Sequence, residues 1–237
     1  MTSHAPLINR FSDNPLGLSK DAFARLNDTY RPLGFAERIK RVYEDFDPSR
    51  IMVTSSFAAT SAYFLHIIST VRPEQVIHFI DTGYHFQETL AYRDYLVDRF
   101  GLKVVDITPD PDHHRVSQEE RMWKTDPDLC CQVNKVSPLE EAKSNYDIWI
   151  SSLMGWQTEH RSGLEIFEER RGMIKCNPRI DVTKAQRDDY IRDHDLPFHP
   201  LVEQGYESIG CSHCTFKGKG REGRWKGQNK TECGLHL

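Results

Sequence analysis

The chain has 237 residues, of which 38% are hydrophobic and 28% charged, and its formal net charge is −4. This length fits one large domain with a substantial core, and the net negative charge argues against a protein that coats nucleic acid. No apolar run reaches the roughly 18–20 residues of a membrane helix, and residues 1–14 lack the basic and apolar regions of a secretory signal. We therefore expect a cytoplasmic protein with reduced cysteines and with neither nucleic acid nor membrane as partner. The sequence leaves open whether the chain forms a homo-oligomer.

Helices are expected first and alternating elements after them. One helix is predicted around Asp21–Asn27, and apolar residues recur at helical spacing in Ala36–Phe46. Strands are then expected at Ile51–Thr54, Gln75–Ile80, Lys103–Thr108, Asp147–Leu153 and Met173–Ile180, with helices over Ser61–Thr70 and Phe86–Phe100 and a turn at the sequence PDPD. This alternation predicts an α/β fold with an open, mainly parallel sheet flanked by helices.

Capping patterns mark two later helix starts. Ser137-Pro138-Leu139-Glu140 combines an N-cap, a proline at the first helical position and a capping-box glutamate. Thr183 and Gln186 repeat the capping pattern before a helix over Lys184–His194.

Regular periodicity fades after Gly205, which suggests a division of the chain there. We interpret residues 1–204 as a nucleotide-binding α/β domain, with a helical extension over 1–48, and residues 205–237 as a tail. Between Lys217 and Lys230 the tail has six lysines or arginines against one acid. This local charge favours an anionic ligand although the whole chain is acidic.

Two turns follow predicted strands at the edge where parallel sheets bind ligands. The first contains Ser55, Ser56 and Phe57, and the second is Asp81-Thr82-Gly83. The serine turn offers hydroxyls, backbone N–H groups and a helix N-terminus to a phosphate, but it is neither a Walker loop nor a G-x-G-x-x-G motif. Taken alone, such a turn is also an ordinary helix cap.

Four of the six cysteines form two pairs. Cys130 and Cys131 are adjacent, and Cys211 and Cys214 form a C-x-x-C pair. Spacing alone fits either a zinc ion or an iron–sulfur cluster, and we do not expect a disulfide between adjacent cysteines in the cytosol. Neighbouring side chains on an α-helix diverge by about 100°, so both adjacent cysteines reach one cluster only if the backbone is kinked there.

The two remaining cysteines differ in their surroundings. Cys176 lies in a predicted strand and reads as a small buried hydrophobe. Cys233 lies in the basic tail, where nearby cations, including His236, favour a reactive thiolate. We therefore interpret Cys233 as a nucleophile that meets an anion.

Three motifs together resemble the adenylyl-sulfate and phosphoadenylyl-sulfate reductase family. They are SSFAATSA after one strand, IDTGYHFQETL after the next, and KTECGLHL near the C-terminus. The resemblance runs from about residue 35 to the end of the chain and implies the adenine-nucleotide alpha hydrolase-like fold. Family members usually have glycine where this chain has Ala58, and alanine fits there comfortably only with a negative φ.

The resemblance also implies a cofactor and a reaction. The arrangement CC…CxxC is similar to the branch in which four cysteines, here Cys130, Cys131, Cys211 and Cys214, hold a [4Fe-4S] cluster. In that branch the thiolate corresponding to Cys233 attacks the sulfur of adenosine 5′-phosphosulfate, expels AMP and becomes an S-sulfocysteine. Thioredoxin or glutaredoxin then releases sulfite.

The same resemblance implies the residues that bind the substrate. Lys135 matches a family lysine placed between cluster and substrate, and Arg161, Arg221 and Arg224 match family arginines that contact phosphate or sulfate. The full expected set is Ser55, Ser56, Phe57, Asp81, Thr82, Gly83, Lys135, Arg161, Arg221, Arg224 and His236.

Three alternatives remain open on the sequence. A reductase for the 3′-phosphorylated nucleotide would use the same chemistry. An ATP-pyrophosphatase-type ligase or adenylyltransferase would share the serine turn and the sheet, but it has no need of ECGLH. A non-enzymatic zinc or cluster module would give no reason for the nucleotide-type turns.

Overall fold

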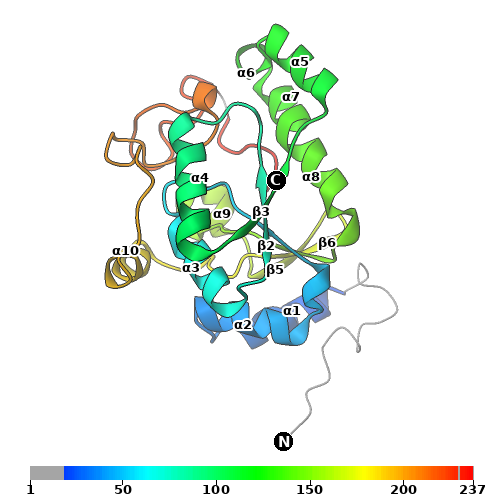
Figure 1. Ribbon diagram of the computed structural model, residues 1–237. Helices are drawn as coiled ribbons and strands as arrows, with labels where there is room; N and C mark the ends of the chain where they lie inside the picture. The colour runs from blue at the N-terminus through cyan, green and yellow to red at the C-terminus, as the bar shows by residue number, and fades with distance from the viewer. Residues whose placement is uncertain (1–18, 229, 237) are drawn as a thin grey trace, which may run out of the picture.

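One six-stranded sheet forms the centre of the molecule. The structure is a computed structural model and describes residues 19–228 and 230–236. The strand order is β3-β2-β1-β4-β6-β5 (Figure 1). The strands are β1 (Ile51–Thr54), β2 (Val76–Ile80), β3 (Lys103–Ile107), β4 (Ile148–Ile150), β5 (Phe167–Arg170) and β6 (Met173–Cys176). All pairings are parallel except that of β5 with β6, so the predicted open, mainly parallel sheet is confirmed.

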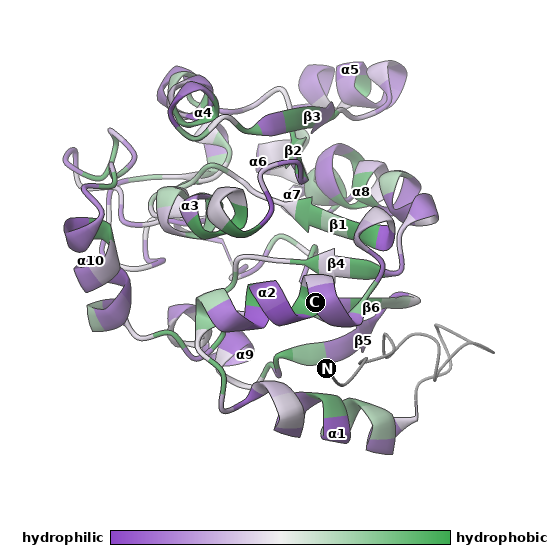
Figure 2. Ribbon diagram, turned by 60° about the horizontal axis from the view of Figure 1, so that its bottom comes forward, coloured by the Kyte–Doolittle hydropathy of each residue, from purple (hydrophilic) through white to green (hydrophobic). Residues whose placement is uncertain are grey.

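Helices cover both faces of this sheet. They are α1 (Lys20–Tyr30), α2 (Phe35–Asp45), α3 (Ser61–Val71), α4 (Gln87–Phe100), α5 (Pro111–Glu119), α6 (Met122–Thr125), α7 (Pro127–Cys131), α8 (Ser137–Ala142), α9 (Glu159–Ser162) and α10 (Lys184–Asp193). Figure 2 shows α3 and α4 on one side of the sheet and α5 and α8 on the other. No helix within the described ranges is both long and apolar enough to cross a membrane. The expectations for residues 1–18, including the absent secretory signal and the start of the helical extension, lie outside the described residues.

Side chains of the central strands point alternately to the two faces of the sheet, and both faces are covered. Ile51 and Val53 of β1 are buried in the larger core with α2, α3 and α4, whereas Met52 points to a smaller core with Leu139 of α8. Trp149 of β4 lies in the smaller core as well. Successive strand side chains point to opposite faces, so an almost continuous apolar run such as IMV is what a strand buried on both sides requires.

Several elements depart from the sequence-based expectations, among them the short helices α6, α7 and α9, which were not expected. Helix α5 occupies the region beginning at PDPD, where only a turn was expected; Asp110 caps it by accepting from the N–H groups of Asp112 and His113. Strand β5 was not expected because three of its four residues are charged. It is the antiparallel edge strand of the sheet, where only one neighbour is needed.

The prediction that Ser137 is the N-cap of a helix is wrong. Helical backbone already begins at Pro127, and residues Gln132–Val136 form a π-helical turn that leads directly into α8. The N–H of Ser137 bonds to the carbonyl of Gln132, five residues back. Pro138 has no N–H for the carbonyl of Asn134, and its ring would collide with that carbonyl in a regular α-helix, which accounts for the wider turn. The capping box of Thr183 and Gln186, in contrast, is confirmed at the start of α10.

Candidate active site

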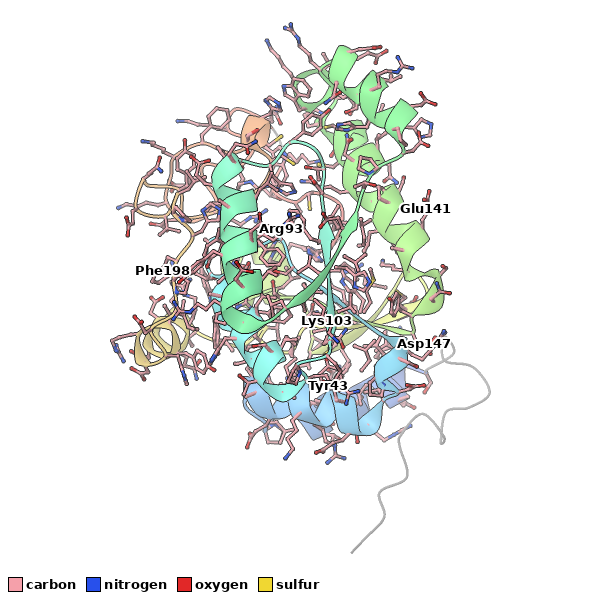
Figure 3. All side chains as sticks on the ribbon, in the orientation of Figure 1. Tyr43, Arg93, Lys103, Glu141, Asp147 and Phe198 are labelled. Atoms are coloured by element: carbon pink, nitrogen blue, oxygen red, sulfur yellow. The ribbon has the colours of Figure 1, made fainter. Side chains whose placement is uncertain are left out.

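A cavity of about 540 Å³ lies at the carboxyl ends of the central strands. Residues after β1, β2 and β4 line one wall, and the tail between Glu207 and His236 lines another. The strand order departs in opposite directions from β1 towards β2 and towards β4, so the cavity lies at a switch point of the kind that binds ligands in open α/β sheets. Phe198, labelled in Figure 3 on the side where α10 lies, stands at its exposed rim.

The serine turn contributes one end of the cavity. Ser55 is buried, and its hydroxyl accepts from the N–H of Phe57 at 3.2 Å. Phe57 has a φ of +47° and packs under the turn against Phe79, so Ser55, Ser56 and Ala58 line the cavity while Phe57 does not. Within the described residues the non-glycine positions with positive φ do not include Ala58. An alanine side chain is therefore accommodated without backbone strain where relatives have glycine.

The turn after β2 links the cavity to the cysteines. Asp81 accepts from the N–H of Gly83, and only Thr82 of this turn lines the cavity. The Thr82 hydroxyl lies 3.4 Å from the Cys211 sulfur. Gly83 has a φ of +68°, and a Cβ there would lie 2.7 Å from the His114 ring. Asp81 and Gly83 thus shape the turn, and Thr82 faces both the cavity and the thiols.

The two cysteine pairs meet in one buried apolar cluster. Cys130 and Cys131 at the end of α7 pack with Cys211 and Cys214 of the tail, enclosed by aromatic residues that include Tyr84 and Trp225. All four thiols are free, and Cys233 packs against the cluster from the cavity side. Among residues 19–228 and 230–236, no three His, Cys, Asp or Glu side chains converge on one point as the ligands of a single metal ion do.

Polar groups surround the sulfur atoms of this cluster. Ser117 and Asn134 donate towards the Cys130 sulfur at 3.9 and 3.7 Å. Burial raises the pKa of Cys130, and burial raises the pKa of Cys131 to about 12. For Cys211 burial acts in the same direction but is outweighed by the charge of Lys135 and by hydrogen bonds from Thr82 and Lys135, so its pKa lies below the usual value. The donors around these atoms favour the deprotonated thiolates that metal centres need.

Lys135 stands between the cysteines and the cavity. It lies in the π-helical turn and lines the cavity. Burial acts to lower its pKa, but the negative charge of Cys211, Cys131 and Cys233 outweighs burial and raises the pKa, so the ammonium group stays charged. The wider turn begins directly after the two adjacent cysteines, which are themselves the last residues of α7, and it includes Lys135.

Arginines supply most of the other cavity donors. Arg161 on α9 and Arg221 in the tail both bind the carboxylate of Glu232. Arg224 lies over the Trp225 ring at 4.5 Å, and a Cβ on Gly210 would collide with its guanidinium group. All three arginines line the cavity.

Several buried donors on the cavity wall have no acceptor within the described part of the chain. These atoms are Arg179 Nη1, Arg221 Nε, Arg224 Nε, Trp225 Nε1 and His236 Nδ1. Buried polar atoms are rarely left unpaired in folded proteins, and here five of them belong to residues that line one cavity. Arginine, with several donors and a permanent charge, is suited to phosphate and sulfate groups.

His236 lies in the site but is not a source of charge. It stacks on Trp149 with 5.2 Å between ring centroids. Burial, together with the positive charges of Lys175 and Arg161, lowers its pKa well below the usual value. The ring is therefore neutral at pH 7.

Comparisons with known proteins agree with this site. Residues 50–217 match the model of the phosphoadenosine phosphosulfate reductase domain. The chain belongs to this family. An adenosine 5′-phosphosulfate reductase of Mesorhizobium japonicum is 37% identical over 97% of this chain and 92% of its own length. The corresponding protein of Chelativorans is 39% identical over 81% of this chain and 80% of its own length.

Solved structures support the fold of the family. A phosphoadenylyl-sulfate reductase from Candida auris superposes with a TM-score of 0.71 at 23% identity, covering 84% of this chain and 98% of its own. A Candida glabrata FMN adenylyltransferase superposes with a TM-score of 0.56 at 11% identity, covering 90% of this chain and 74% of its own. The resemblance to the family and to an adenine-nucleotide alpha hydrolase-like fold is therefore confirmed.

Some residues of this family site were not identified from the sequence. Glu232 was read only as part of the motif ECGLH, although its carboxylate is buried and holds two arginines. Arg179 was not considered, yet it lines the cavity and its Nε and Nη2 donate to the carbonyl of Ser152. The acidic residue directly before the nucleophile was a visible signal for Glu232, whereas nothing in the local sequence marks Arg179.

Proposed function

We propose that this chain is a thioredoxin- or glutaredoxin-linked oxidoreductase that converts adenosine 5′-phosphosulfate to sulfite and AMP. The observation that carries the proposal is the position of Cys233 on a cavity at the sheet's switch point, whose lining also includes Lys135, Arg179, Arg221 and Arg224. A nucleotide with a phosphosulfate group supplies both the anion for these donors and an electrophilic sulfur. A relative named adenosine 5′-phosphosulfate reductase matches 97% of the chain.

The reaction proceeds in two displacement steps. The Cys233 thiolate attacks the sulfur of the substrate, a sulfur–sulfur bond forms, and the sulfur–oxygen bond to AMP breaks. A thiolate of the reduced carrier then attacks the Cys233 sulfur of the S-sulfocysteine, forms a mixed disulfide and expels sulfite. The second carrier thiol resolves the mixed disulfide and restores Cys233. The carrier dithiol provides both electrons.

The cationic side chains and the serine turn bind different parts of the substrate. Lys135 and Arg224 face the cavity from its cysteine side, where the sulfate group would meet the thiolate. The N–H of Ser56 suits the nucleotide phosphate, because the serine turn lies beside the start of α3, whereas the N–H of Ser55 already donates to the carbonyl of His78. Fixed donors aimed at the charge that develops on the departing AMP oxygen lower the barrier to its departure.

The donor set fits a [4Fe-4S] cluster held by Cys130, Cys131, Cys211 and Cys214. The fit rests on four free thiols in one buried cluster, on donors beside the sulfur atoms of Cys130 and Cys211, and on a lysine that compensates thiolate charge. When bound, the cluster would supply a fixed electrostatic and structural partner for Lys135 and the tail. Zinc with four cysteine ligands is the alternative occupant, and the visible spectrum of freshly purified protein separates the two.

Substitution of the nucleophile tests the reaction. We expect Cys233→Ser to abolish sulfite formation from adenosine 5′-phosphosulfate and reduced thioredoxin while iron and sulfide content stay as in the wild type. Cys176→Ala is the matched control, because Cys176 is a buried core residue away from the cavity. Turnover by Cys233→Ser would show that another group attacks sulfur.

The 3′-phosphorylated nucleotide is the closest competing substrate. The ratio of kcat/KM for the two nucleotides decides between them, and we expect the ratio to favour adenosine 5′-phosphosulfate. We also propose that the protein works in the reducing cytoplasm and that residues 205–237 form one unit that carries the nucleophile Cys233. Sulfite formed only from the 3′-phosphorylated nucleotide would overturn the substrate assignment and leave the chemistry intact.

A further inference from the structure

Glu232, directly before the nucleophile, is the most enclosed acid of the tail. Its side chain is 1% exposed. Oε1 accepts from Arg161 Nε at 2.8 Å and from the Thr158 hydroxyl at 3.1 Å. Oε2 accepts from Arg161 Nη2 at 2.8 Å and from Arg221 Nη2 at 3.3 Å. The pair with Arg161 is therefore bidentate, the strongest form of carboxylate recognition.

These partners belong to different parts of the molecule. Thr158 caps α9 and Arg161 is part of that helix, which follows β4, whereas Glu232 belongs to the tail. A buried carboxylate is costly unless it is paired and hydrogen-bonded. Glu232 can therefore be buried only when the tail is docked with Arg161 in place. Consecutive Cα atoms are about 3.8 Å apart, so fixing Glu232 also fixes the backbone of Cys233.

The donors of the three arginines are used differently. Arg161 has an acceptor for each nitrogen, because its Nη1 also bonds to Gln157 at 2.5 Å. Arg221 and Arg224 each keep a buried Nε without an acceptor among the described residues. Arg161 is thus committed to the protein while the other two have donors to offer.

We propose that Glu232 is a positioning residue, an anionic latch that seats Cys233 over the cavity, and that Arg161 serves this latch rather than the substrate anion. Arg161 also neutralises the Glu232 charge, which would otherwise repel an anionic substrate close to the thiol. The activity part of this inference rests on the proposed function, whereas the seating of the tail does not.

Alkylation of Cys233 tests the latch without any substrate. Full-length protein with its metal centre is treated with iodoacetamide over a pH series, and the tail peptide is quantified by mass spectrometry. The rates are compared on the high-pH plateau, where a change in thiol ionisation has no effect and only accessibility matters. We expect Glu232→Gln to raise the plateau rate at least about tenfold, with the exposed Glu203→Gln as an unaffected control. An unchanged plateau rate in Glu232→Gln would overturn the latch.

Steady-state kinetics test the role of Arg161. We expect Glu232→Gln and Arg161→Gln each to lower kcat about tenfold or more with little change in KM, and the double variant to be no worse than the poorer single one. Glu232→Asp, which keeps the charge on a shorter arm, should recover part of the loss. A tenfold rise in KM on adding Arg161→Gln to Glu232→Gln would assign Arg161 to the substrate and overturn this part. A wild-type protein that forms no sulfite would refute the proposed function and leave the alkylation result standing.

Discussion

The charged partners of a side chain, more than its burial or residue type, decide which side chains of the site carry charge. Lys135 keeps its charge because the negative charge of Cys211 in particular outweighs burial, whereas His236, which the sequence placed beside Cys233 as a cation, has its pKa lowered by burial. Glu232 is buried as well, yet hydrogen bonds and charges from Arg161 and Arg221 outweigh burial and lower its pKa. A residue's role in this cavity therefore follows from the partners that meet it there.

The pH dependence of protein stability tests the burial of His199. This side chain is fully buried; its Nδ1 accepts from the N–H of Leu201, and its Nε2 lies 3.0 Å from the Thr89 hydroxyl. Burial lowers its pKa to about 4. Between pH 6.5, where the unfolded chain takes up the proton, and pH 4, the folded state binds fewer protons, so stability must fall as pH falls, by up to about 3 kcal/mol.

Replacing His199 should make the free energy of unfolding less dependent on pH. His199→Gln should lose less of its free energy of unfolding between pH 7 and pH 5.5 than the wild type does, as measured by urea unfolding. Its absolute stability at pH 7 will be lower because packing is lost. His113→Gln, at an exposed position, is the control and should keep the wild-type slope. Equal slopes for wild type and His199→Gln would contradict the assignment.

At the scale of elements, the π-helical turn decides how the cysteines and Lys135 share one site. Cys130 and Cys131 are the last residues of α7, where neighbouring side chains diverge by about 100°. The turn over Gln132–Val136 widens the helix immediately after them, and π-helical turns are frequent at functional sites. Pro138 holds the turn open because it cannot donate to Asn134.

Replacing Pro138 tests this dependence. Pro138→Ala restores an N–H and permits a regular α-helix, which would rotate Lys135 relative to the cysteine pair. We expect kcat for sulfite formation to fall about tenfold or more, while the thermal midpoint stays the same or rises because a helix-breaking residue is removed. Pro111→Ala, at the first turn of α5 where no helical bond is missing, should leave kcat unchanged. Unchanged kcat in Pro138→Ala would show that the turn is not required.

At the scale of the whole molecule, two distant segments meet over the end of the sheet. Figure 1 shows the tail and the helices α5 to α8 at the same end, away from α1 and α2. Contacts between the cysteine pairs and an ion pair of Lys230 with Asp128 join the tail to α7. The backbone N–H of His199 also donates to the carbonyl of Ala59, which connects the segment before the tail to the serine turn.

Loss of one cysteine should therefore affect both the proposed metal centre and the docking of the tail. We expect Cys211→Ser to lose iron and sulfite formation together and to raise the plateau alkylation rate of Cys233. Iron analysis after anaerobic purification and the alkylation assay measure these effects. Cys176→Ala again serves as the control for removing a buried thiol outside the cluster. Iron-free Cys211→Ser with full activity would refute the coupling.

Much of the fold was predictable because local patterns agree with it. The runs at Ile51–Thr54 and Gln75–Ile80 and the capping box at Thr183 fix elements through apolar periodicity and local hydrogen bonds. Strand β5 was missed because its charged sequence is acceptable only at a sheet edge. The π-helical turn was misread because Ser137 and Pro138 form a typical helix start, and only the preceding residues show that the helix is already under way.

The sequence by itself determined the α/β class, the family, the nucleophile Cys233 as a candidate and the cysteines that could share a site. Motifs carry this information because each requires a few residue types at short, fixed spacing. Only the tertiary structure decided that Arg161 and Arg221 meet Glu232, that Phe57 lies beneath the cavity and that His236 is neutral. These outcomes depend on burial and on partners up to about 70 residues away in the chain, and neither is encoded in local spacing.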